Sequence, residues 1–139
     1  MMELNVSLTR IYNFSAAHRL NSEILDEKKN VEVYEKCNNP LGHGHNYKLE
    51  LTVSGTPDSE TGMILPPNEL DQKVRTLLDE LNYKHLNNEV PYFKTRISSG
   101  ENIVQYLWDQ LDERIGKGML YHLKLWETNN NSFELGKEN

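Results

Sequence analysis

The feature that most constrains the fold of this chain is a strictly alternating segment at residues 46–54, NYKLELTVS. Apolar and polar side chains alternate along it, and the apolar positions are Tyr47, Leu49, Leu51 and Val53. A period of two residues is the repeat of a β-strand, whereas a helix would bring apolar residues back every three or four positions. We therefore expect a strand that buries one face and exposes the other.

Three further segments predict strands. Residues 3–14 alternate at first and then carry larger apolar side chains. Residues 119–128 are rich in apolar and aromatic residues, and residues 132–136 predict a short last strand.

Two other segments have the spacing of amphipathic helices. Residues 66–82 place leucines on one helical face, and Asn68 is the expected N-cap. Residues 98–118 have a similar stripe, with Ser98 or Ser99 as the N-cap and glycines after the last apolar residue.

The order strand, strand, helix, helix, strand, strand predicts an α+β fold, with a four-stranded antiparallel sheet and both helices on one face. The length suits one hydrophobic core, so we expect a single domain over residues 1–139. The other face of the sheet needs a partner to pack against, and we therefore expect a homo-oligomer. Residues 19–36 are polar and weakly patterned, and we expect a long connection there.

The charge balance argues against nucleic acid as a partner. Lys and Arg number 15 against 21 Asp and Glu, which gives a net charge of −6, whereas nucleic-acid binding needs positive charge. The single cysteine excludes an intrachain disulfide. No segment has the length and hydropathy of a signal peptide or a membrane span. We expect a soluble cytoplasmic protein with no membrane partner.

Three histidines can meet at one end of the predicted sheet. His43 and His45 lie two residues apart at the entrance to a strand, so their side chains point the same way. His18 ends the first strand, and antiparallel pairing of the first two strands would bring it near them. Three imidazoles with an open fourth position are typical of catalytic zinc; the alternative is three ordinary histidines. His122 alternates within a strand, and we expect it to be structural.

Cys37 lies six residues before His43. It could be a fourth ligand in a closed structural zinc site, a catalytic thiol beside the metal, or a packed side chain without chemistry. Zinc or an imidazolium nearby would lower the pKa of the thiol. The spacing alone does not select among these roles.

Several motifs resemble those of the 6-pyruvoyl tetrahydropterin synthase family. They are FSAAHRL, KCNNPLGHGHNYKLELTVSG, TGMI, NNEVPYF, SGENI and YHLKLWETNNN, in that order from about Phe14 to Phe133. Five residues separate Cys37 from the HGH motif, as in the pyruvoyl enzymes, whereas the related 6-carboxy-tetrahydropterin synthases usually have three. The resemblance implies the tunnelling fold, in which three subunits close their sheets into a barrel and two trimers stack into a hexamer.

The resemblance also implies roles for individual residues. It implies Zn²⁺ on His18, His43 and His45, and it makes Cys37 the general base rather than a ligand. It makes Glu127 the catalytic-site carboxylate that holds the amino and ring N–H groups of a pterin, since a carboxylate facing two parallel donors is a directional anchor.

The segment SSGEN, which contains Ser99 and Glu101, would line the pterin pocket. Glu101 has an alternative role as the capping-box partner of Ser98. The implied substrate is 7,8-dihydroneopterin triphosphate, from which triphosphate is eliminated while the side chain becomes a diketone. Zinc would act as a Lewis acid on side-chain oxygens, and the thiolate would take a proton. Three basic residues are candidates for binding the triphosphate, namely Arg19, Lys48 and Lys84.

The sequence departs from the family pattern at residues 82–85, NYKH. The family carries an Asp-His proton relay here, which reaches the cysteine of a neighbouring subunit, but this chain has Asn82 and Tyr83. Asn82 carries no charge, and an unperturbed tyrosine has a pKa of about 10. Three alternatives follow: His85 replaces the relay, Tyr83 acts directly as a catalytic acid, or the pyruvoyl activity is weak or absent. In the last case the chain would catalyse another dihydropterin reaction, such as 6-carboxy-tetrahydropterin formation or retro-aldol cleavage, or would bind zinc and pterin without turnover.

Overall fold

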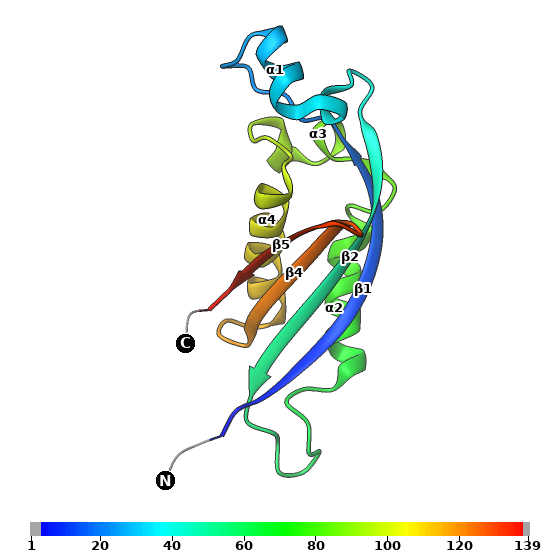
Figure 1. Cartoon of the computed structure of the whole chain (residues 1–139). Helices are drawn as coiled ribbons and strands as arrows, with labels where there is room; N and C mark the ends of the chain where they lie inside the picture. Colours follow the sequence, from blue (N-terminus) through cyan, green and yellow to red (C-terminus); the bar gives the residue numbers. More distant parts are fainter. Residues whose placement is uncertain (1–3, 138–139) are drawn as a thin grey trace.

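A computed structural model describes residues 4–137 of the chain (Figure 1). Its centre is a five-stranded sheet in the order β3-β1-β2-β4-β5. The strands are β1 (Val6–His18), β2 (His43–Gly55), β3 (Lys84–His85), β4 (Leu120–Thr128) and β5 (Asn131–Gly136). The four longer strands are those predicted from the sequence, and they pair antiparallel. Glu3, at which the first predicted strand starts, lies outside the described residues.

β1 and β2 form a long antiparallel pair that positions one end of the sheet. Their pairing runs without a register shift from Val6 opposite Gly55 to His18 opposite His43. The alternation of β2 is confirmed, because its four apolar side chains, from Tyr47 to Val53, are fully buried. Since the register does not shift, the last residue of β1 lies directly beside the first residue of β2.

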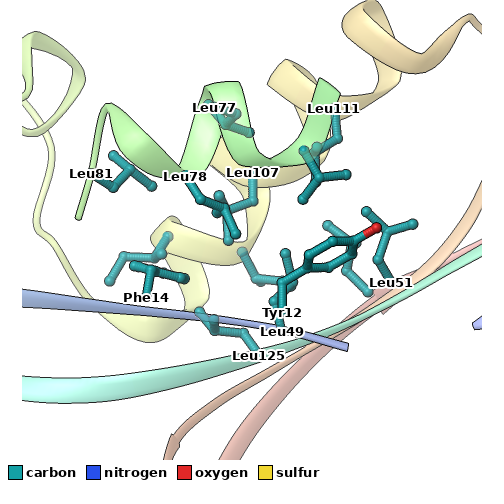
Figure 2. Packing of buried hydrophobic residues seen from close by; sticks show 14 of the residues in the cluster. Tyr12, Phe14, Leu49, Leu51, Leu77, Leu78, Leu81, Leu107, Leu111 and Leu125 are labelled. Atoms are coloured by element: carbon teal, nitrogen blue, oxygen red, sulfur yellow. The ribbon is translucent and has the colours of Figure 1, made fainter. Parts of the chain in front are cut away.

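Two helices cover one face of the sheet, α2 (Pro67–Asp79) and α4 (Gly100–Ile115) (Figure 1). Figure 2 shows the core between the two layers, where Leu78 and Leu107 of the helices face Leu49 and other strand residues. Burying each leucine stabilises the fold by about 1.5–3 kcal/mol. The predicted α+β arrangement, with both long helices on one face, is confirmed.

The sequence predicted one helix start and missed the other. Ser99 caps α4, because its Oγ accepts a hydrogen bond from the Asn102 backbone N–H at 3.3 Å. The expected cap at Asn68 is wrong, since α2 already begins at Pro67. Proline is favoured at the first position of a helix, where its φ is suitable and its missing N–H costs nothing.

The polar segment 19–36 contains a helix that the sequence did not reveal. This helix is α1 (Glu27–Tyr34), and its buried residue is Asn30. The Asn30 side chain accepts a hydrogen bond from the Ser22 N–H at 2.7 Å and donates one to the Ser22 carbonyl at 2.9 Å. A polar anchor rather than an apolar stripe fastens α1 to the fold, so hydrophobic periodicity could not detect it.

Short elements complete one edge of the sheet. β3 pairs in parallel with Ala16 and Ala17 of β1, so the sheet has five strands instead of the expected four. α3 (Leu86–Glu89) follows β3 directly, and 3-10 turns span Glu35–Asn38 and Pro91–Lys94. A two-residue strand is too short to leave a period in the sequence.

The sheet face away from α2 and α4 is polar. Lys48 and Lys124 lie over the Trp126 ring, at 5.0 and 4.6 Å from its centroid. His122 forms an ion-pair contact of 3.3 Å with Glu134, in line with a structural role. Within residues 4–137, no helix combines the length and the apolar character that crossing a membrane requires.

Candidate active site

The ends of β1 and β2 bring three histidines together. His18 and His43 are paired residues, and His45 lies two positions further along β2 on the same face. One ring nitrogen from each residue lies within 4.8 Å of the others, and the Nε2 atoms of His43 and His45 are 2.8 Å apart. The structure therefore brings together the three residues that the sequence proposed as metal ligands.

His18 is held in one orientation. Its Nδ1 lies 2.7 Å from the Ser98 carbonyl oxygen, which can only accept, so Nδ1 carries the proton and donates. Its Nε2 is buried and has no hydrogen-bond partner among the described residues. Burial lowers the pKa of His18, which favours the neutral ring. With its proton on Nδ1, the neutral ring has its free lone pair on Nε2. An unpaired buried nitrogen is costly unless a ligand occupies it.

The three imidazoles fit a zinc ion. Zinc bound tetrahedrally at about 2.0–2.1 Å keeps its nitrogen ligands about 3.4 Å apart, which lies between the 2.8 and 4.8 Å observed in this cluster. Burial, followed by the proximity of His43, also lowers the pKa of His45. Neutral imidazoles are the form that binds a transition metal, which the lowered pKa values of His18 and His45 favour. Donor type and spacing agree with zinc as well.

Cys37 is positioned by the turn that follows α1. Its carbonyl accepts a hydrogen bond from the Leu20 N–H at 2.7 Å, and Asn38 Nδ2 donates to the Leu20 carbonyl at 2.7 Å. These bonds tie the turn to the end of β1 and place Cys37 Sγ 3.6 Å from His43 Nε2. The sulfur lies beside the three-histidine group and is not a member of it.

The protein groups around Cys37 raise the pKa of its thiol. Burial is the largest cause, and the charges of Glu127 and Glu35 add to it. A cation held by the histidines would act in the opposite direction, because it favours the thiolate.

Glu127 reaches the same cluster from β4. Its two carboxylate oxygens lie 3.9 Å from His18 Nε2 and 3.9 Å from His45 Nε2. Leu123, Leu125 and Glu127 are the alternate buried positions of β4, so the strand period itself directs Glu127 to this face of the sheet. The Glu127 residue is only 9% exposed. It is one of the residues that line the cavity beside this cluster.

A cavity of about 800 Å³ opens between the turn carrying Cys37 and the strands β2 and β4. Cys37, His43, His45 and Glu127 line it, and its remaining wall is made by Glu35, Lys36, Asn39, Pro40 and Thr128. Sequence reasoning missed Lys36, although its position next to Cys37 was a usable signal. It supplies positive charge at the cavity, where an anionic ligand would need it.

Ser99 and Glu101 are not brought to this cavity in the single chain. Ser99 caps α4, and Glu101 lines a separate cavity of about 580 Å³ between α4 and β5. The capping box between Ser98 and Glu101 is wrong, since Ser99 is the cap. The Ser98 hydroxyl bonds elsewhere, to Asn87 Oδ1 at 3.1 Å.

Asn82 and Tyr83 are not among the residues that line the cavity of Cys37 in the single chain. Asn82 Oδ1 accepts a hydrogen bond from the Ser15 N–H at 2.8 Å, so this side chain fastens the edge of β1. Tyr83 has a φ of 60°, its N–H donates to the Ser15 carbonyl at 2.6 Å, and it is 85% exposed. A non-glycine residue in this left-handed region is uncommon, and here it turns an aromatic ring outward.

His85 lies beside Tyr83 and not in the three-histidine group. Both line a depression together with Lys84 and Glu89. A Cβ atom on Gly42, whose φ is +78°, would lie 2.7 Å from His85 Nε2, so His85 packs against the loop before His43. Its Nδ1 is buried without a partner among the described residues.

The three basic residues proposed for the triphosphate are scattered. Arg19 Nε donates to the Asn38 carbonyl at 3.1 Å, Lys48 lies over Trp126 on the polar face of the sheet, and Lys84 lines the depression beside Tyr83. None of them is among the lining residues of the cavity that holds Cys37.

Comparisons with known proteins agree with this arrangement. The family model described as 6-pyruvoyl tetrahydropterin synthase matches residues 7–138. The chain is 42% identical to the 6-pyruvoyl tetrahydrobiopterin synthase of Homo sapiens over 125 residues, which cover 89% of this chain and 86% of that protein. It is 44% identical to the Drosophila melanogaster protein of the same name over 126 residues, or 89% and 75% of the two chains.

A solved structure is similar over nearly the whole chain. The 6-pyruvoyl tetrahydropterin synthase of Caenorhabditis elegans superposes with a TM-score of 0.92 at 34% identity, and the match covers 97% of both chains. The Plasmodium falciparum enzyme shares the fold, with a TM-score of 0.67 at 16% identity. The chain therefore belongs to the 6-pyruvoyl tetrahydropterin synthase family.

Proposed function

We propose that this protein is a zinc-dependent lyase that eliminates triphosphate from 7,8-dihydroneopterin triphosphate and forms 6-pyruvoyl tetrahydropterin. The observation that carries the proposal is the cluster of three histidines beside one cavity, which His43, His45, Cys37 and Glu127 line, in a chain of this family. Its relatives in Homo sapiens and Drosophila melanogaster are named for the synthase activity.

Each group around the cavity has a task in this reaction. A zinc ion on His18, His43 and His45 would supply Lewis-acid polarisation of the side-chain oxygens. Cys37, beside this group, takes the proton from a carbon that carries a hydroxyl, as a general base.

Glu127 and Lys36 position the substrate. The Glu127 carboxylate accepts hydrogen bonds from the pterin amino and ring N–H groups, which fixes the ring. Lys36 provides positive charge for the phosphates at the same cavity. Ser99 and Glu101 contribute to a pterin pocket that forms between two neighbouring copies of the chain.

Tyr83 acts as an acid on a neighbouring copy. Its outward ring and left-handed backbone support this role, because a buried or inward tyrosine could not reach another subunit. The proposal thus includes a homo-oligomer, a trimer or a dimer of trimers, in which the open edges β3 and β5 of the sheet are paired. A cytoplasmic location remains a prediction, which the single cysteine supports.

Turnover is the direct test. Zinc-loaded protein is incubated with 7,8-dihydroneopterin triphosphate, and triphosphate and pterin products are separated by chromatography. The unaltered protein is expected to release triphosphate. The variants Tyr83→Phe and His85→Ala then identify the relay group, because loss of a positioned acid–base group costs about a hundred- to ten-thousand-fold.

A second candidate function is favoured by Asn82 and Tyr83, which stand where the family has its relay. If only the Asn82→Asp, Tyr83→His double variant releases triphosphate, the unaltered chain is not a pyruvoyl synthase. It would then catalyse a different dihydropterin side-chain reaction, or bind zinc and pterin without turnover, and the same assay with 7,8-dihydroneopterin would separate these two.

A further inference from the structure

Asn87 in α3 joins the end of β1 to the segment before α4. Its Oδ1 accepts a hydrogen bond from the Arg19 backbone N–H at 2.8 Å. The same oxygen accepts a second bond from the Ser98 hydroxyl at 3.1 Å. The N–H of Arg19 can only donate, so the amide orientation of Asn87 is determined by its partner.

Ser98 connects Asn87 to a histidine of the proposed metal site. The Ser98 residue is fully buried, and its carbonyl oxygen accepts the Nδ1–H bond of His18 at 2.7 Å. Its hydroxyl also lies 3.3 Å from the Arg19 carbonyl, so the side chain is held from two sides. One amide oxygen on Asn87 therefore anchors the segment on which the tautomer of His18 depends.

The other bonds of this segment do not replace Asn87. Asn102 Nδ2 donates to the Ile97 carbonyl at 2.8 Å, and Ser99 caps α4. Both contacts attach the segment to α4 and neither attaches it to β1, which carries His18. Asn87 is the side chain that spans both. Its loss would leave the Arg19 N–H without its acceptor and the Ser98 hydroxyl with only the longer contact of 3.3 Å to the Arg19 carbonyl.

We propose that Asn87 is a positioning residue for metal binding, because its Oδ1 holds the Ser98 carbonyl against His18 Nδ1 and so directs His18 Nε2 at the metal. The inference rests on the proposed zinc site. Groups that orient a metal-bound histidine in this way typically contribute about ten- to a hundredfold to metal affinity. The acceptor matters here and not the amide itself, so an aspartate at this position should serve equally well.

The experiment measures Co²⁺ and Zn²⁺ affinity by competition with a chelator, together with the visible spectrum of the Co²⁺ form. Asn87→Leu keeps the size of the side chain and removes the acceptor, whereas Asn87→Asp keeps the acceptor. Asn88→Leu, the same change at the exposed neighbour in α3, is the matched control. The spectrum is needed because it reports the geometry of the three nitrogens, which a general loss of stability does not alter.

We expect Asn87→Leu to weaken both metals by about tenfold or more and to change the Co²⁺ spectrum. Asn87→Asp and Asn88→Leu should match the unaltered protein within about threefold. Equal affinity in Asn87→Leu and the unaltered protein would overturn the inference, and so would an equal loss in Asn87→Asp. If Asn87→Leu does not fold, Ser98→Ala takes its place, with severalfold weaker binding expected and unchanged binding contradicting us. Failure of the unaltered protein to bind either metal would instead overturn the zinc site itself.

Discussion

At the scale of single residues, the site depends on side chains whose spacing in the sequence is uninformative by itself. Cys37 shows this most clearly, since its place in the sequence is compatible with a fourth zinc ligand, a general base and a thiol without chemistry. The structure places its sulfur 3.6 Å from His43 Nε2 and outside the three-histidine group. Two ligands of one zinc ion can also be separated by such a distance, so it is the place of the sulfur outside the group that favours a base over a ligand.

Replacing Cys37 by alanine should therefore separate metal binding from catalysis. We expect zinc content and melting temperature to stay nearly unchanged, while triphosphate release falls by about a hundred- to ten-thousand-fold, the range for removing a general base. Metal analysis, thermal unfolding and the turnover assay measure the three quantities. His43→Ala is the comparison, and it should lose the metal. A Cys37→Ala protein that also loses zinc would make the cysteine a ligand of a closed site.

At the scale of elements, one polar cluster connects the central sheet with α2. Arg10 donates from Nε and NH2 to the two carboxylate oxygens of Asp71, at 2.9 and 2.8 Å, and the Tyr12 hydroxyl donates to the same carboxylate at 2.6 Å. The Arg10 hydrogen bond, and after it the Tyr12 bond, lower the pKa of Asp71. A bidentate pair of this kind fixes the direction from which α2 meets β1.

This cluster predicts acid sensitivity. Because the pKa of Asp71 is lower in the folded protein than in the unfolded chain, the carboxylate stabilises the fold above its unfolded pKa, and this contribution is lost as the pH falls through the folded pKa. The melting temperature of the unaltered protein should drop more steeply from pH 5 downwards than that of Asp71→Asn. Asp79→Asn, at the exposed end of the same helix, should retain the steep profile. Parallel profiles for all three proteins would show that the pair does not contribute.

At the scale of the whole molecule, the groups of the proposed site are divided between places that one chain does not bring together. Glu127 and Cys37 share a cavity, whereas Glu101 lines another and Tyr83 lines a third depression, which His45 also borders. The sheet also ends in the unpaired edges β3 and β5. A site shared between copies accounts for all of these features.

Mixing two inactive variants tests a shared site. Cys37→Ala and Tyr83→Phe are each expected to be inactive, but oligomers that contain both should regain activity. In a random mixture roughly a quarter of the sites combine an intact Cys37 with an intact Tyr83 from the neighbour. The proteins are unfolded together, refolded and assayed for triphosphate release, and the separately refolded variants are the control. Activity that never exceeds the sum of the two controls would mean that each chain works alone.

The sequence by itself determined the long strands, the two long helices, their order and the family motifs. These features are local, since a period of two or of 3.6 residues and a run of matching motifs can be read without knowing what lies across the sheet. Sequence patterns did not reveal α1, which a buried asparagine fastens to the fold, or β3, in which only two residues pair.

Only the tertiary structure decided which of these residues meet. The unbroken register of β1 and β2 joins His18 to His43, and the pairing of β2 with β4 brings the Glu127 carboxylate to the same cluster. The network through Asn87 and the outward turn of Tyr83 likewise depend on contacts between segments far apart in the chain. Such contacts follow from packing and from hydrogen bonds between elements, and neither leaves a local period in the sequence.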